Sequence, residues 1–204
     1  MNREGVPPAG PRRSTLALAV LALLAEAPMH PYRMQQLIRQ RAKDTVVNVG
    51  QRTSLHKAIE RLMTAGLVAV REVGREHNYP ERTTYELTPA GGDVLRRWMR
   101  DALAAPAREY PEFPAILSFL ALLPPEEVRR QLAERVERLR SDIAELEGQV
   151  ETTPVPRLFL VEDEYRVAVR RAELEWIERI IPDLESGALD WTPAFPKEPD
   201  GAGH

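Results

Sequence analysis

Three helical patterns followed by two short strand-like stretches limit the folds open to the first half of this chain. Apolar residues recur at helical spacing over residues 14–25, 31–42 and 51–65. The strand-like stretches are residues 67–73 and 83–87, and the polar segment 74–82 separates them as a hairpin tip would. Residues 45–49 are rich in β-branched side chains, and we expect a short extended piece there. This order of elements is typical of a winged helix-turn-helix.

The ends of these elements carry the residue types that such ends favour. The Ser14–Thr15 pair can cap the first helix, and Pro31 suits the first position of the second. Gly66 follows the third helix, where a left-handed helix end favours glycine. The Thr88–Pro89 pair starts a fourth helix, which we expect to run to about residue 104.

The first apolar helix allows a second interpretation. Arg12 and Arg13 precede the apolar run 16–25, and residues 25–27 fit a small-x-small cleavage site, so the segment resembles a short secretion signal. The run is too short to cross a membrane. Because it continues directly into the second helical pattern, we interpret it as a buried helix.

The second half of the chain is helical throughout its patterned segments. These segments are residues 113–123, 126–150 and 158–186. The middle one has a heptad seam, which we expect to need a partner surface: Leu132, Val136, Leu139, Ile143, Leu146 and Val150. The last one has an apolar stripe: Val161, Tyr165, Ala168, Ala172, Trp176, Ile180 and Leu184. We predict that the seam, together with Tyr165 and Trp176, forms a dimer interface.

The predicted fold is mainly α with a small β-hairpin, in which a winged helix-turn-helix DNA-binding domain precedes an α-helical dimerisation domain. We expect these domains at residues 14–104 and 110–187. Residues 1–13 are expected to form a flexible arm, and residues 188–204 a disordered tail.

Charge divides the chain into the same two halves. Residues 1–100 hold 16 Lys/Arg and 9 Asp/Glu, a net of +7, whereas residues 101–204 hold 12 and 22, a net of −10. This division is expected if only the first half meets a polyanion, and the alternative is chance clustering on two solvated surfaces. The chain has no cysteine, which excludes a disulfide framework, thiolate zinc sites and thiol catalysis and is compatible with the cytoplasm.

The third helix has the side chains that DNA recognition requires. Short hydroxyl groups can reach base edges or phosphates, and cations can neutralise phosphate. The candidates on this helix are Arg52, Thr53, Ser54, His56, Lys57 and Arg61. Those at the hairpin tip are Arg75, His77, Asn78 and Arg82. Each cation alone is explained as well by an ordinary solvated surface, but their concentration on one predicted surface favours DNA binding.

Several segments resemble the PadR family of bacterial transcriptional regulators. They are 18–25 with His30-Pro-Tyr-Arg-Met34, 54–62 with Gly66-Leu67, Pro80-Glu-Arg-Thr-Thr-Tyr85, Leu87-Thr-Pro-Ala-Gly91, 113–125, and Glu162-Asp-Glu-Tyr165 with the last helix. The resemblance covers about residues 14–187. It implies a homodimer whose C-terminal helices pack against the partner subunit and which represses by occupying an inverted-repeat operator. In some members of the family a small aromatic or cationic compound releases the repressor.

The same resemblance implies roles for individual residues. Tyr32, Ser54, His56 and Lys57 occupy positions that commonly touch DNA in the family, although His56 stands where the family usually has tyrosine. Trp98 is the candidate for ligand binding, because some members stack flat compounds on a tryptophan of this helix. The alternative is that Trp98 is a core residue at helical spacing.

Two other classes of function are alternatives to a DNA-binding regulator. An enzyme is not expected, because the histidines (His30, His56, His77, His204) are scattered and neither a metal-binding pair, a nucleophile elbow nor a phosphate-binding glycine loop occurs. We therefore predict no cofactor and no metal. A protein-interaction module that uses the winged scaffold without DNA is the remaining alternative, and replacing Lys57 and Arg61 with alanine distinguishes it from a DNA-binding regulator.

Overall fold

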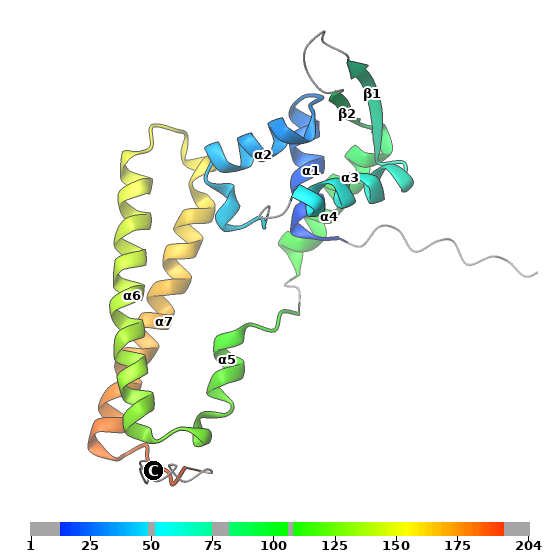
Figure 1. Cartoon of the computed structure of the whole chain (residues 1–204). Coiled ribbons are helices and arrows are strands. Elements are labelled where there is room, and N and C mark those ends of the chain that lie inside the picture. The colour runs from blue at the N-terminus through cyan, green and yellow to red at the C-terminus, as the bar shows by residue number, and fades with distance from the viewer. Residues whose placement is uncertain (1–12, 49–51, 75–81, 106–107, 194–204) are drawn as a thin grey trace, which may run out of the picture. The chain divides into compact units, whose positions relative to one another are not determined.

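The computed structural model describes residues 13–48, 52–74, 82–105 and 108–193, and the chain divides into two compact units at Arg108/Glu109 (Figure 1). Unit 1 contains α1 (Thr15–Glu26), α2 (Pro31–Gln40), the 3₁₀ helix η1 (Lys43–Thr45), α3 (Arg52–Thr64), β1 (Val68–Gly74), β2 (Arg82–Leu87) and α4 (Pro89–Ala104). Unit 2 contains α5 (Glu112–Leu117), η2 (Leu120–Leu122), α6 (Pro125–Thr152), η3 (Arg157–Phe159) and α7 (Val161–Ser186). The predicted fold class, mainly α with a small hairpin, is confirmed.

Helix α1 is the centre of unit 1. It begins where Ser14 Oγ accepts a hydrogen bond from the Ala17 N–H at 3.1 Å, as the capping prediction required. Because α1 is apolar on nearly all sides, the other elements of the unit pack around it, and its interpretation as a buried helix fits this position. The fully buried side chains of this core include Val20, Leu21, Met34, Leu55, Ile59 and Leu62.

The β-hairpin is tied to the turn before α2. Strands β1 and β2 are antiparallel, with Val68 opposite Leu87 and Gly74 opposite Arg82. Met29 and Tyr85 exchange two backbone hydrogen bonds of 3.0 and 3.1 Å, which adds a single-residue bridge to the other edge of β2. The hairpin is therefore anchored by backbone pairing on both edges of β2.

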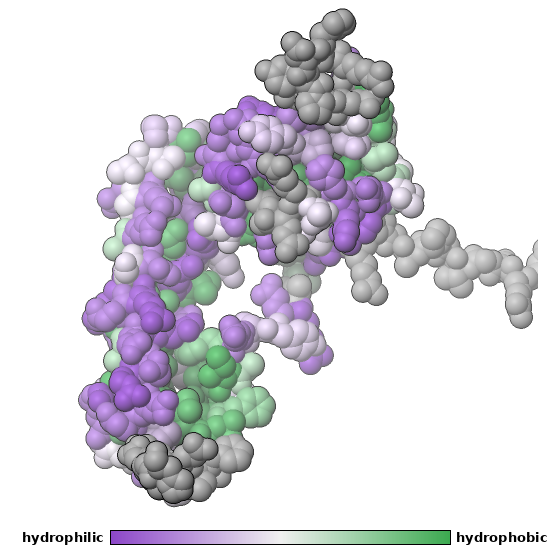
Figure 2. Space-filling view, in the orientation of Figure 1, coloured by the Kyte–Doolittle hydropathy of each residue, from purple (hydrophilic) through white to green (hydrophobic). Residues whose placement is uncertain are grey.

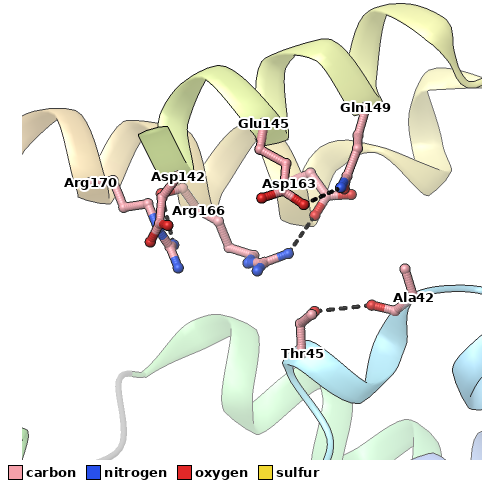
Figure 3. A network of polar contacts seen from close by, with 8 residues as sticks. All are labelled: Ala42, Thr45, Asp142, Glu145, Gln149, Asp163, Arg166 and Arg170. Atoms are coloured by element: carbon pink, nitrogen blue, oxygen red, sulfur yellow. Dashed lines mark hydrogen bonds and ion pairs between the residues drawn. The ribbon is translucent and has the colours of Figure 1, made fainter. Parts of the chain in front are cut away.

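The extended piece expected at residues 45–49 is absent from its described part, residues 45–48. The Thr45 hydroxyl donates to the Ala42 carbonyl at 2.9 Å (Figure 3), and the N–H groups of Val46 and Val47 both donate to the Lys43 carbonyl. These local bonds form η1 and its closing turn. The prediction was wrong because β-branched residues favour a strand only where a neighbouring strand is available.

In unit 2, α6 and α7 form an antiparallel helical hairpin. The seam residues Leu132, Val136, Leu139, Ile143 and Leu146 are buried, and Val150 is partly buried. They pack against α7, whose buried residues are Val167, Ile177 and Leu184. Helix α7 of the same chain therefore supplies a facing surface for the seam, and the role of the seam in a dimer stays a prediction.

Ion pairs cross between the two helices on both sides of the seam. The Arg135 and Glu173 side chains are 2.5 Å apart, and those of Arg140 and Glu178 are 2.8 Å apart. Figure 3 shows another cross-helix pair, Arg170 beside Asp142, whereas Arg166–Asp163 and Gln149–Glu145 lie within a single helix. Being mostly exposed, these pairs fix the register of the helices more than they add stability.

The stripe predicted on α7 matches the buried face only in its C-terminal half, where Trp176, Ile180 and Leu184 belong to the core cluster of unit 2. Tyr165 is 70% exposed, and Val161 is also exposed. The buried residues of α7 are Val167, Ile177 and Leu184, and Trp176 is partly buried with its ring edge-on to Phe113. Helix α7 has apolar residues on two faces, and the sequence pattern alone could not select the one that meets α6.

The first part of the expected tail is ordered. Gly187 ends α7 in the left-handed conformation, with φ of 74°. Trp191 then packs against the core of unit 2, and its Nε1–H donates to the Leu123 carbonyl at 2.9 Å. The prediction of disorder from residue 188 was therefore wrong for residues 188–193. Residues 194–204 and most of the predicted arm, residues 1–12, lie outside the described part.

Candidate nucleic-acid interface

Helix α3 has two faces of opposite character. Leu55, Ala58, Ile59 and Leu62 are buried and fix the helix to the core of unit 1. The other face carries exposed side chains at Thr53, His56, Lys57, Glu60 and Arg61, with Ser54 partly buried at the boundary. The helix is held rigidly on one side while hydrogen-bonding and cationic groups face outward on the other.

Lys57 and Arg61 are one turn apart on this outer face. The Arg61 Nε–H donates to the Lys57 carbonyl at 3.1 Å, which lays the guanidinium along the helix. Neither cation forms an ion pair with a described residue. Their charges are therefore available to an external anion, and Glu60 between them limits the attraction to moderate strength.

The start of α2 adds an aromatic side chain. His30 Nδ1 accepts a hydrogen bond from the Arg33 N–H at 3.1 Å and so caps the helix, with Pro31 in the first turn as predicted. The Tyr32 ring stacks on His30 at a centroid distance of 6.2 Å and is largely exposed. His30 is thus structural, and it orients a tyrosine whose hydroxyl can donate to phosphate.

Five of the predicted contact residues contribute no described side chain. Arg52 begins α3 and Arg82 begins β2, but their side chains, together with Arg75, His77 and Asn78 of the hairpin tip, lie outside the described residues. Their roles stay predictions. The described part of β1 and β2 carries one ion pair, between Arg71 and Glu86 at 3.8 Å.

The junction of α3, β1 and α4 contains a close backbone approach that the sequence patterns did not reveal. Gly66 has φ of 71°, and its carbonyl accepts from the Thr88 hydroxyl at 2.8 Å. The same hydroxyl accepts from the Gly91 N–H at 3.0 Å, and a Cβ at Gly91 would lie 2.1 Å from the Leu67 carbonyl oxygen. A glycine in the first turn of an otherwise helical pattern was the available signal for this contact.

Trp98 lies in the core of unit 1. It is 8% exposed and belongs to the same cluster as Leu95 and Leu24. Its carbonyl oxygen is 3.5 Å from the Arg13 Nη1. The core position matches the packing alternative, and the ligand-binding role stays a prediction.

The described ranges contain neither a metal-binding group nor a membrane-spanning helix. There, no three His, Asp or Glu side chains come close enough together to hold a metal ion. None of the described helices combines the length and apolar character that crossing a bilayer requires.

Three helices and an antiparallel hairpin in this order, with cations on the outer face of α3, define a winged helix-turn-helix protein. Residues 20–97 match the model of the Transcriptional regulator PadR-like family. The match covers less than half of the chain, and over these residues it confirms the resemblance that the motifs predicted. The matched segment runs from within α1 to within α4 and contains the whole candidate interface.

Solved structures extend the similarity to most of the chain. Bacillus subtilis PadR in complex with operator DNA is 17% identical, with a TM-score of 0.64, over 84% of this chain and 99% of that chain. The same protein in complex with p-coumaric acid is 16% identical, with a TM-score of 0.61, over 84% and 99%. The Vibrio cholerae virulence activator AphA is 22% identical, with a TM-score of 0.60, over 85% and 99%. At these identities the similarity establishes the fold, and sequence comparison with curated proteins finds no match.

Proposed function

We propose that this protein is a sequence-specific DNA-binding regulator of transcription that represses as a homodimer on an inverted-repeat operator. The observation that carries the proposal is the division of α3 into a fully buried apolar face and an outer face with two cations free of ion pairs within the described chain. A recognition helix needs this rigid attachment to the core to hold its outer side chains in position, whereas an ordinary solvated surface helix does not.

The proposed docking follows from the dimensions of α3. Its 13 residues span about 20 Å at 1.5 Å per residue, which suits a major groove about 12 Å wide. Thr53 and Ser54 at its start would reach base edges or phosphates, and Lys57 and Arg61 further along would neutralise phosphates. Tyr32 would donate to the backbone beside the groove. The hairpin tip with Arg75, His77 and Asn78 would lie over the neighbouring phosphates.

The homodimer is part of the proposal. One winged unit covers about half of an operator, and a twofold dimer places two such units on an inverted repeat. The solved operator complex of Bacillus subtilis PadR, which shares this fold, supports the same use of the fold here. We place the regulator in the cytoplasm, where it would meet the chromosome.

A small aromatic effector is the second part of the proposal. It is supported by the complex of Bacillus subtilis PadR with p-coumaric acid and by the presence of Trp98 on α4. Because Trp98 is packed in the core, a ligand stacked on it would have to displace neighbouring side chains. Release of bound DNA by p-coumaric acid tests this part, and unchanged binding at millimolar concentrations would contradict it for this compound.

The main test uses the DNA immediately upstream of the protein's own gene in a mobility-shift assay at two salt concentrations. We expect a discrete complex with two subunits per site, weakened steeply by salt because phosphate neutralisation releases counterions. Absence of a specific complex on this DNA and on fragmented genomic DNA would favour the protein-interaction alternative.

A further inference from the structure

Glu60 places an exposed carboxylate on the outer face of α3, the face that the proposed function brings to a polyanion. Figure 2 shows mostly hydrophilic surface over α3, and Lys57 and Arg61 supply the cations that suit phosphates. A carboxylate is repelled by phosphates instead. Glu60 therefore has to face another group of the DNA if α3 docks as proposed.

Glu60 points away from the core of unit 1. The opposite side of α3 is buried, at Leu55, Ala58, Ile59 and Leu62. At about 100° per residue, Glu60 lies about 150° around the helix axis from the mean direction of these buried residues, and Arg61 lies about 110° from it. Glu60 is therefore near the middle of the outer face, whereas Arg61 is towards one edge.

Glu60 also points in nearly the same direction as Thr53. The seven residues between their positions turn the helix to about 20° short of two full turns and advance it by about 10 Å. The proposed docking has Thr53 reach base edges or phosphates from the start of the helix. With α3 lying along the groove, Glu60 faces the base edges on the floor of that groove, and its longer side chain extends farther from the helix than that of Thr53.

The Glu60 carboxylate has no ion-pair partner within the described part of the chain. Lys57 lies one turn before it without forming a pair, and the Arg61 Nε–H donates to the Lys57 carbonyl at 3.1 Å. The Thr64 hydroxyl donates at 2.9 Å to the backbone carbonyl of Glu60 and not to its carboxylate. Both carboxylate oxygens can therefore accept hydrogen bonds from an external donor.

We propose that Glu60 is a specificity-determining residue, which accepts a hydrogen bond from the N4 amino group of a cytosine in the major groove. The proposal rests on the DNA-binding function proposed above, and it names one base that each half-site should contain. A carboxylate can only accept hydrogen bonds, and in the major groove only cytosine N4 and adenine N6 donate them. Adenine places its N7 acceptor beside N6, so cytosine is the base that a carboxylate favours.

The same carboxylate discriminates against the wrong bases. Thymine presents the O4 acceptor to the major groove, and guanine presents N7 and O6. Each of these acceptors repels a carboxylate at the position where cytosine would donate to it. Specificity then comes from a repulsive element as well as an attractive one, while Lys57 and Arg61 supply affinity for any sequence.

Base substitutions in a selected operator test the proposal. The full-length wild-type protein first selects its site from duplex DNA with a random central region, and each base pair of that site is then replaced in both half-sites. Mobility shift at one salt concentration gives the dissociation constants of the wild type, Glu60→Ala, Glu60→Gln and Asp101→Ala on every duplex. Asp101 is an exposed carboxylate of α4, so its variant is the matched control for the loss of one negative charge.

We expect one C·G pair in each half-site at which replacement by T·A weakens wild-type binding at least fivefold, since a mismatched pair usually costs about 5- to 150-fold. Glu60→Ala should reduce this difference to less than about twofold and keep the preferences at the other pairs. Glu60→Gln should accept adenine at this pair, because a glutamine amide can pair with adenine N6 and N7. Asp101→Ala should keep every wild-type preference.

Two results would overturn the role of Glu60 and leave DNA binding intact. In one, Glu60→Ala changes the affinity for all duplexes equally and keeps every base preference, so that Glu60 acts only by general repulsion. In the other, Glu60→Ala removes a preference at a pair that contains no cytosine contact, because T·A is tolerated there by the wild type. A wild-type protein that selects no sequence would contradict the proposed function itself.

Discussion

Gly91 lies so close to Leu67 that a Cβ on Gly91 would be 2.1 Å from the Leu67 carbonyl oxygen. The same carbonyl accepts a hydrogen bond from the Thr88 N–H at 3.1 Å. Both partners of this contact are backbone groups, which cannot rotate away as a side chain could. The start of α4 is therefore fixed to the junction between α3 and β1, and the orientation of the candidate recognition helix relative to the hairpin depends on this glycine.

The neighbouring glycines of α4 provide a matched pair of substitutions. We expect Gly91→Ala to lower the free energy of unfolding by about 2–3 kcal/mol, because the clash forces a backbone shift. Gly92→Ala meets only ordinary contacts, the nearest at 3.6 Å from Arg96, and should be neutral or stabilise by up to about 1 kcal/mol. Urea unfolding measures both, and equal effects at the two positions would contradict the close approach.

Replacing Ala42 with glycine should stabilise the fold. It follows α2 with φ of 52°, in the left-handed region that side chains disfavour. We expect Ala42→Gly to raise the free energy of unfolding by about 0.5–1 kcal/mol. The same change at Ala144, an exposed position inside α6, should lower it by about 1 kcal/mol. Thermal unfolding distinguishes the two, and a shift of the same sign would show that Ala42 is not strained.

The Glu26 and Arg41 side chains join the ends of α1 and α2. Arg41 donates two hydrogen bonds to the carboxylate, of 2.5 and 2.7 Å, and these hold the pKa of Glu26 below its ordinary value. A lowered carboxyl pKa stabilises the fold above the pKa of the unfolded chain, about 4.3. This contribution is lost as the pH falls through the folded-state pKa.

We therefore expect an NMR titration to give a Glu26 pKa below about 4.3, and Arg41→Ala to raise it towards that value. Because both side chains are nearly half exposed, the pair should contribute at most about 1 kcal/mol. Arg39→Ala, which removes a neighbouring cation that forms no ion pair with Glu26, is the control. A Glu26 pKa that does not respond to Arg41→Ala would contradict the bidentate contact.

Trp191 should stabilise unit 2 although it follows the last helix. Trp191→Phe removes the hydrogen bond to the Leu123 carbonyl and should cost about 1 kcal/mol. Trp191→Ala also removes its packing against the core and should cost about 2–3 kcal/mol. Urea unfolding of the wild-type protein and the two variants measures both effects. If neither substitution changes its unfolding, residues 188–193 behave as the disordered tail that the sequence predicted.

Most of the fold could be predicted because its local signals agree with its tertiary contacts. Ser14, Pro31, Gly66 and Thr88 mark real element ends, and the spacing of Leu55, Ile59 and Leu62 identifies the buried face of α3. A pattern that fits two partners leaves the choice between them open. The heptad seam of α6 specifies that an apolar helix faces it but not whether that helix comes from the same chain.

The sequence predicts only part of the candidate DNA interface. Periodicity places Thr53, His56, Lys57 and Arg61 outward, and the structure agrees for all four. The contact of Gly91 with Leu67 and the bridge between Met29 and Tyr85 could not be predicted, because each joins segments far apart in sequence through backbone atoms that carry no residue-type signal. Side-chain patterns report faces of helices, and they do not report where two backbones meet.

The most direct test of the central claim compares DNA binding by the wild-type protein with that by the double variant Lys57→Ala/Arg61→Ala. Arg97→Ala, which removes an exposed cation from α4, is the control. With two variant subunits on the operator, losing four phosphate contacts should weaken binding at least a hundredfold and make the salt dependence shallower, by up to about 4 in the log–log slope. Wild-type affinity in the double variant, with the control equally unaffected, would contradict the assignment of α3 as the recognition helix.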